Sequence, residues 1–209
     1  MTLTVNNREE LYRLLPEVMK IKDPKIQEEI ERYLIEEVPD YFWNRESSSS
    51  GKYHSKDETG KYGLLLHTKR VFTALERLMK SWKDMGKINK NEKDLARAAV
   101  LLHDTFKFGV STDFEGNVIP GRHTVSDHDR IASEQFLQKT QILGTTKTKI
   151  AKGIAAHNGP WGCSQNPETN FQLLIHLCDM FAADKKAELA VYKPFEGLKE
   201  IGVTSWRDQ

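Results

Sequence analysis

Cysteine is scarce in this chain of 209 residues, which contains only Cys163 and Cys178. Two cysteines that do not form a Cys-x-x-Cys pair cannot build a disulfide framework, and this scarcity favours a reducing compartment. The sequence after Met1 also lacks the charged-then-apolar pattern of a secretory signal. We therefore expect a cytoplasmic protein.

Long hydrophobic runs and an excess of either charge are missing as well. The longest apolar runs, such as Ala98 to Leu102, are far shorter than the roughly 20 residues that span a bilayer. The net charge is +1, from 31 basic and 30 acidic residues, whereas nucleic-acid or membrane-surface proteins normally carry a basic excess. We expect no membrane partner and no dedicated nucleic-acid partner. The balanced net charge is still compatible with a local basic pocket that binds phosphates. Assembly into a homo-oligomer is also possible for this sequence.

Strand patterns are almost absent, and helical periodicity recurs along most of the chain. Residues 110–122 are the exception and predict a loop or a short hairpin, because Gly116, Pro120 and Gly121 interrupt them. The sequence predicts an all-α fold in one domain, with a core at about 60–190, N-terminal helices and a loop at 1–59, and a tail at 191–209. Two predicted helices start near Asn7 and Asp23, and two more follow an Asn91 cap and a Thr124 or Ser126 cap. Three others are predicted over about 62–82, 146–157 and 167–190.

The segment from Tyr41 to Gly63 is the longest irregular stretch before the core helices. Four serines at 47–50 followed by Gly51 are typical of a flexible connection. Lys52, Tyr53 and His54 are nevertheless residues that bind ligands, and they precede a helix that carries another histidine. Two interpretations stay open, a linker and a loop that closes over a site.

Metal-binding residue types occur on the apolar faces of five predicted helices. A lone histidine on such a face is usually a hydrogen-bonded core residue. Here six groups would each need a separate partner if no ion were present, and one or two divalent cations would satisfy all of them. Imidazole and carboxylate ligands suit Mn, Fe, Zn, Ni or, less well, Mg. The six residues are His67, His103, Asp104, His128, His157 and Asp179.

Two other histidines are weaker candidates. His123 could replace His128, but it precedes the expected helix cap, whereas His128 shares a face with Ala132 and Phe136. His176 lies one turn before Asp179 and is either a partner of a ligand or a packed core histidine.

The ordered pattern His…His-Asp…His…His…Asp resembles that of the HD-domain metal-dependent phosphohydrolases. Three local motifs are similar to those of that family: Leu66 to Val71, Leu102-His103-Asp104-x-x-Lys107, and His157 to Trp161. The resemblance covers roughly residues 60–190. Ser49 to His54 also resembles a feature of a poorly characterised subgroup of the superfamily, for which no substrate follows.

The resemblance implies a ligand set for two divalent metal ions. Carried over position by position, a first ion would be held by His67, His103, Asp104 and Asp179. Asp104 would bridge to a second ion, which His128 and His157 would complete. Thr105-Phe106 stands where many members have a small residue and a glycine, which affects the local turn and not the ligands.

The implied activity is hydrolysis of a phosphoester, in a nucleotide or a phosphodiester, by metal-activated water. Two other interpretations are a mixed-valent di-iron oxygenase on the same ligands, as in proteins resembling myo-inositol oxygenase, and a nucleotide-binding regulatory module. For the phosphohydrolase we expect Asp104 and Lys107 to be catalytic and His54 to act on the leaving group. Phosphate or substrate contacts are expected from Lys52, Arg70, Lys107 and Trp161. The alternatives are solvated charges for Lys107 and Arg70 and a core position for Trp161.

Overall fold

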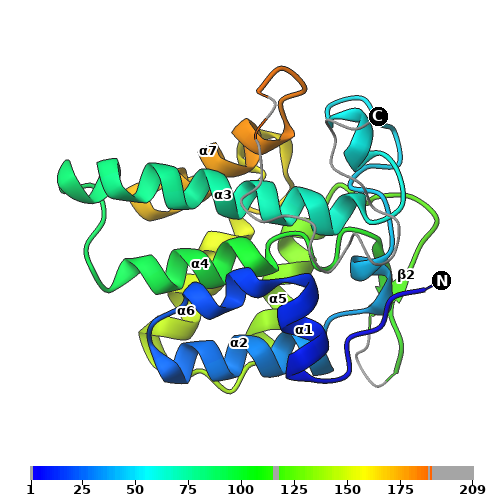
Figure 1. The fold of residues 1–209 in the computed structure, drawn as a ribbon, viewed down its shortest axis with the longest axis horizontal. Helices are drawn as coiled ribbons and strands as arrows, with labels where there is room; N and C mark the ends of the chain where they lie inside the picture. Colours follow the sequence, from blue (N-terminus) through cyan, green and yellow to red (C-terminus); the bar gives the residue numbers. More distant parts are fainter. Residues whose placement is uncertain (1, 115–117, 188, 190–209) are drawn as a thin grey trace.

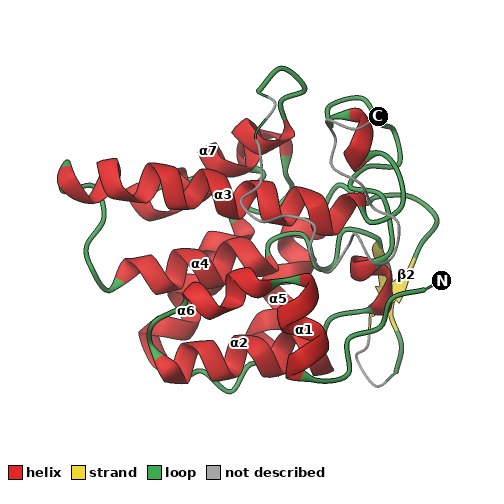
Figure 2. Cartoon of the chain, in the orientation of Figure 1, coloured by secondary structure: helices red, strands yellow, loops and turns green. Residues whose placement is uncertain are grey.

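The computed structural model describes residues 2–114, 118–187 and 189, and helices dominate this described part of the chain (Figures 1 and 2). The all-α prediction is confirmed. The α-helices are α1 (Arg8–Leu14), α2 (Pro24–Glu36), α3 (Gly63–Asp84), α4 (Glu92–Leu102), α5 (His128–Lys139), α6 (Gly144–Ala155) and α7 (Asn170–Ala183). Short 3₁₀ helices are η1 (Pro16–Lys20), η2 (Asp40–Trp43), η3 (Lys56–Glu58) and η4 (Gly159–Trp161).

The first two helices begin where their capping residues predict. The Asn7 side chain accepts a hydrogen bond from the Glu10 amide at 3.0 Å, which satisfies one of the unpaired donors of the first turn of α1. In α2, Asp23 accepts from the amides of Lys25 and Ile26 and Pro24 occupies the first helical position. Pro16 ends α1 as expected, because proline cannot donate to the helical ladder.

Three helices differ from the sequence prediction at one or both ends. The amides at the start of α4 bond to the Asn89 side chain and not to Asn91. Helix α5 begins only at His128, and neither Thr124 nor Ser126 caps it; Ser49 binds Thr124 instead. Helix α7 starts at a Thr169 capping box and already ends at Ala183, while the tail at 191–209 lies outside the described residues.

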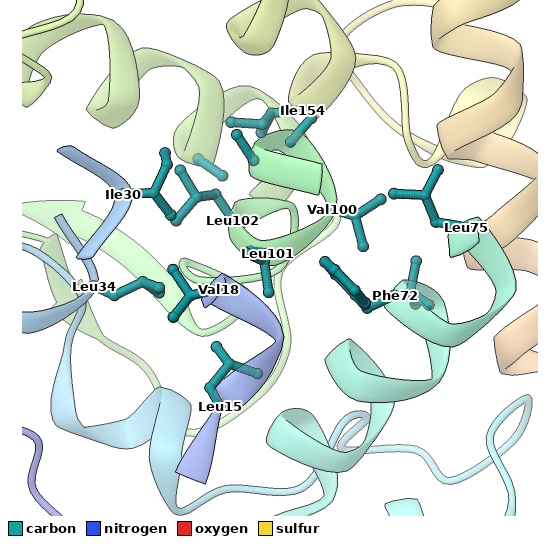
Figure 3. Packing of buried hydrophobic residues seen from close by; sticks show 14 of the residues in the cluster. Leu15, Val18, Ile30, Leu34, Phe72, Leu75, Val100, Leu101, Leu102 and Ile154 are labelled. Carbon is teal, nitrogen blue, oxygen red and sulfur yellow. The ribbon is translucent and has the colours of Figure 1, made fainter. Parts of the chain in front are cut away.

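Helix α4 lies at the centre of the fold. In Figure 1 it runs between α3 and α7 on one side and α1 and α2 on the other, with α5 and α6 behind it. Its small and branched residues are buried, and Figure 3 shows side chains of η1, α2, α3 and α6 around Val100, Leu101 and Leu102, namely Val18, Ile30, Phe72, Leu75 and Ile154. The C-terminal end of this central helix leads directly into His103 and Asp104, so packing around α4 places the two residues in the middle of the molecule.

The segment after Asp104 forms a short hairpin, which was one of the two alternatives, loop or hairpin, that the sequence predicted for residues 110–122. Strands β1 (Gly109–Thr112) and β2 (Val118–Pro120) pair in antiparallel register. Among the described helices, none is both long and apolar enough to cross a bilayer.

Candidate metal centre

The six predicted ligands come together at one buried place, although they come from five different parts of the chain. His67 lies inside α3, His103 and Asp104 follow α4, His128 opens α5, His157 follows α6, and Asp179 lies in α7. All six side chains are buried, and those of His67 and His103 are fully so. Buried groups of this kind need partners, because leaving water costs them their hydration.

Asp104 stands between two groups of imidazoles. Its Oδ2 atom lies 3.6 Å from Nε2 of His67 and 3.4 Å from Nε2 of His103. Its Oδ1 atom lies 3.1 Å from Nε2 of His128 and 3.4 Å from Nε2 of His157. One carboxylate therefore presents each of its oxygens to a different pair of histidines.

Asp179 closes the first of these two groups. Its Oδ1 atom lies 2.9 Å from Nε2 of His67 and 3.7 Å from Nε2 of His103. Within the described residues, Nε2 of His103 and Oδ1 of Asp104 are buried and make no hydrogen bond. Three groups of described residues have ligand atoms near enough for an ion: His67–His103–Asp104, Asp104–His128–His157 and His54–Glu58–His67. Unpaired nitrogen and carboxylate donors that converge in this way fit divalent cations.

Three of the four histidines are oriented by the backbone. Nδ1 of His103, His128 and His157 each donates to the carbonyl oxygen three residues earlier, at 2.7 Å in every case. A proton held on Nδ1 leaves Nε2 free to bind a metal. The local turns at the helix ends thus select the tautomer that a metal site requires.

The charges around the centre keep its carboxylates ionised. Burial alone would raise the pKa of Asp104, but Lys107 and His103 outweigh it and hold the pKa well below its usual range. Burial likewise opposes ionisation of Asp179, and the contact with His67 lowers its pKa in spite of this. For His67, burial lowers the pKa, while Glu58 and Asp179 raise it to about 9. Two ionised carboxylates in a buried site favour a cation between them.

A cavity of about 630 Å³ opens beside the centre. Asp179 from the metal centre forms part of its wall. So do four residues singled out from the sequence for substrate contact or catalysis, namely Lys52, His54, Lys107 and Trp161. The loop at 44–62 therefore lies beside the predicted ligands and is not remote from them. Tyr53, noted in the sequence together with Lys52 and His54, also lines the cavity, as does Asn158 of the motif that runs from His157 to Trp161. The remaining lining residues were not predicted: Met180, Ala183, Asp184, Lys185 and Lys186.

Two of the predicted substrate residues have informative neighbours. Nζ of Lys107 donates to Oδ2 of Asp104, so this lysine reaches the metal centre itself. Trp161 is 68% exposed and stacks on His176, with 5.8 Å between the ring centroids. A core position for Trp161 is therefore wrong. His176 donates to the carbonyl oxygen of His157 at 2.7 Å, which makes it a neighbour of a predicted ligand.

Arg70 and His123 lie apart from this cavity. Arg70 lines a neighbouring cavity and binds the carboxylates of Asp57 and Glu58. Its guanidinium thus holds the loop against α3. His123 is exposed, and His128 takes the place next to Asp104.

Glu58 is the buried residue that sequence reasoning missed. Its side chain is fully buried, and its Oε2 atom accepts from Nδ1 of His54 at 2.7 Å and lies 3.4 Å from Nδ1 of His67. Burial would raise the pKa of Glu58, but His67, His54 and Arg70 hold it well below its usual range. The signal in the sequence was faint, namely a carboxylate four residues after His54 and nine before His67.

Comparison with known proteins places this arrangement in a family. The family model of the HD domain matches residues 64–186, more than half of the chain. No curated protein and no solved structure matches the chain. The match begins just before His67 and extends past Asp179, so it contains all six converging residues. HD domains are commonly metal-dependent hydrolases, and this chain belongs to the HD-domain family.

Proposed function

We propose that the protein is a metal-dependent phosphohydrolase that cleaves a phosphoester of a nucleotide or a phosphodiester. One observation carries the proposal: Asp104 faces two imidazole pairs with its two oxygens, beside a cavity lined by lysines. The metal centre would supply the ionised nucleophile, and the lysines would attract the phosphate.

The six converging residues would hold two divalent ions. His67, His103 and Asp179 would bind one ion together with Oδ2 of Asp104, and His128 and His157 would bind the other together with Oδ1. Bound ions of this kind lower the pKa of a water ligand and neutralise charge that develops on a phosphoryl group.

The lysines of the cavity would bind the phosphate. Lys107, Lys52, Lys185 and Lys186 line one space of about 630 Å³ with Asp179 and Asp184, so positive side chains outnumber carboxylates. Lysine is a common phosphate ligand, and its ammonium adjusts to the oxygens through a flexible stem. An uncharged substrate would gain nothing from these lysine charges, which favours phosphoester hydrolysis over oxidation of a neutral molecule.

His54 is placed to act on the leaving group. Its Nδ1 atom is bound to Glu58, which leaves Nε2 as the nitrogen for a ligand in the cavity that His54 lines. In the reaction the oxygen of water bonds to phosphorus, the bond from phosphorus to the leaving oxygen breaks, and a proton passes to that oxygen. His54 would deliver this proton from Nε2.

The aromatic residues of the cavity favour a substrate that carries a base. Trp161 and Tyr53 are 68% and 64% exposed and line the same space as the lysines. Exposed rings of this kind stack on nucleobases. The combination fits a nucleoside phosphate better than a small sugar phosphate.

The test couples metal analysis to a substrate screen. The purified protein is expected to retain about two divalent ions per chain and to release phosphate or a nucleotide from part of a nucleotide and diester panel when Mn²⁺ is present. Protein that holds metal but hydrolyses nothing in the panel would contradict the proposal. An electron paramagnetic resonance signal of a mixed-valent di-iron centre in such protein would point to the oxygenase, and saturable nucleotide binding without turnover to a regulatory module.

A further inference from the structure

The fourth histidine of the candidate metal centre is not oriented by the backbone carbonyl that orients each of the other three. His103, His128 and His157 lie at helix ends, where the carbonyl three residues earlier accepts from Nδ1. His67 lies within α3. The corresponding carbonyl of Leu64 is engaged in the helix and also accepts from the hydroxyl of Thr68 at 3.0 Å.

Nδ1 of His67 faces Glu58 instead. The atom is buried and makes no hydrogen bond within the described residues, and Oε2 of Glu58 lies 3.4 Å from it. The same Oε2 atom accepts from Nδ1 of His54 at 2.7 Å, and the two imidazoles pack edge to face with 4.8 Å between their centroids. One carboxylate oxygen is thus shared by a predicted metal ligand and a predicted catalytic residue.

Glu58 is itself held firmly in place. Its Oε1 atom accepts from Nη1 of Arg70 at 2.5 Å. Its backbone carbonyl accepts from both the amide and the hydroxyl of Ser47, each at 2.8 Å. Gly63 lies so close that a Cβ there would meet the Glu58 carbonyl oxygen at 1.9 Å. These contacts fix the position of the carboxylate between the loop and α3.

We infer that Glu58 is a positioning residue that orients His67 toward the metal and His54 toward the substrate with one buried carboxylate. In this role Glu58 would accept from both Nδ1 atoms, so that Nε2 of His67 would face the ion beside Asp179 and Nε2 of His54 would face the cavity. A carboxylate in this place also makes the imidazole a better ligand. The inference rests on the proposed metal centre and not on the identity of the reaction.

Glu58→Gln is the decisive variant, and Asp57→Asn is its matched control. Glutamine has a single carbonyl oxygen, so it cannot accept from Arg70 on one side and from two imidazoles on the other. Asp57 is the neighbouring carboxylate and also binds Arg70, at 2.5 Å and 3.0 Å, but no contact joins it to His54 or His67. Both variants lose a carboxylate that binds Arg70, and only Glu58→Gln loses the acceptor of the two histidines.

The affinity for Mn²⁺ or Zn²⁺ is measured by competition with a chromophoric chelator. Circular dichroism checks that each variant is folded. We expect Glu58→Gln to weaken binding of the ion held by His67 by roughly 10- to 100-fold, and Asp57→Asn to stay near wild type. Equal affinities of Glu58→Gln and wild type would overturn the inference. So would an equal loss of affinity in Asp57→Asn, because Arg70 alone would then explain the effect.

A second measurement does not depend on any variant folding. Long-range ¹H–¹⁵N spectra of the Zn²⁺-loaded wild-type protein report which ring nitrogen carries the proton. We expect both rings to carry a proton on Nδ1 and the metal-bound His67 to carry none on Nε2. A ring of His67 or His54 without a proton on Nδ1 would overturn the inference. If wild-type protein binds no divalent ion, the proposed function fails; if it binds ions but Glu58→Gln binds them equally well, the inference alone fails.

Discussion

Oδ1 of Asp104 lies 3.1 Å from Nε2 of His128, while Oδ2 of the same carboxylate faces His67 and His103. Asp104→Asn would keep the shape of the side chain but replace one oxygen with a donor, so it could not bridge two cations. We expect Asp104→Asn to lose both ions and turnover. Asp104→Ala should lose them as well, and it should also unfold more easily, because the histidines lose the ion that satisfies them. Elemental analysis and thermal unfolding with and without chelator test this, and turnover in either variant would show that the centre lies elsewhere.

The loop residues of the cavity should affect turnover and not metal content. Lys52→Ala removes a charge beside the phosphate and His54→Ala removes the proposed proton donor, so each should lower turnover by roughly ten- to a thousandfold. Lys56→Ala is the control, because Lys56 is exposed on the same loop and lines the neighbouring cavity. Wild-type rates for both Lys52→Ala and His54→Ala would identify the loop as a linker.

Trp161→Ala should discriminate between substrates. The loss of a stacking partner costs about 1–3 kcal/mol per base, so KM for a nucleotide substrate should rise by roughly 5- to 150-fold. KM for a phosphoester without a base should stay unchanged, and the ratio of the two constants is the measurement. An equal rise for both kinds of substrate would indicate that Trp161 supports the cavity wall through His176 and does not bind a base.

The two cysteines should differ in reactivity. Cys163 is exposed, whereas Cys178 is fully buried in α7 and burial raises its thiol pKa. Because the thiolate is the reactive form, a thiol reagent should modify one cysteine per folded chain and two in denaturant. Mass spectrometry of peptides identifies the site, and early modification of Cys178 would contradict the packing of α7.

The ionised Glu29 carboxylate should stabilise the fold at neutral pH, and this stabilisation should be lost in acid. Burial would raise its pKa, but Arg32, the Gln141 amide and the Thr140 hydroxyl outweigh it, so its pKa lies below the ordinary value of 4.5. A lowered pKa in the folded state stabilises the fold above about pH 4.5, and this contribution is lost as the pH falls through the lowered value. The free energy of unfolding in urea should therefore fall less between pH 7 and pH 3.5 in Glu29→Gln than in wild type. Glu28→Gln, an exposed neighbour on α2, should behave like wild type, and identical pH profiles for Glu29→Gln and wild type would contradict the assignment.

Sequence reasoning located the helices and the converging residues because both have a local signature. The periodic apolar faces of α3 and α7 carry His67 and Asp179 inward, and that of α6 leads directly to His157. Asn7 and Asp23 mark the starts of their helices because both are capping residues. The start of α5 was wrong by a few residues because Thr124 bonds to Ser49, 75 residues away, and no local pattern contains that partner.

The roles of Arg70 and Glu58 were hidden for the same reason. An arginine one turn after a ligand histidine resembles a phosphate contact, and only the folded loop shows that Asp57 and Glu58 occupy its guanidinium. Lys185 and Lys186 were missed because they follow the end of α7, in a stretch predicted to continue the helix. Contacts between a loop and a distant helix depend on the path of the chain, which composition and periodicity do not determine.

The shared carboxylate of Glu58 limits how the loop can change. In many enzymes a substrate loop can be exchanged as a separate module, because the catalytic centre is held by the scaffold alone. Here the loop that carries Lys52 and His54 also supplies the acceptor that faces His67. A loop grafted from another protein would therefore alter metal affinity together with substrate preference, unless it brought a carboxylate to the same place. Engineering of this cavity should begin from the lysines that follow α7, since no contact joins them to the ligand histidines in the described part of the chain.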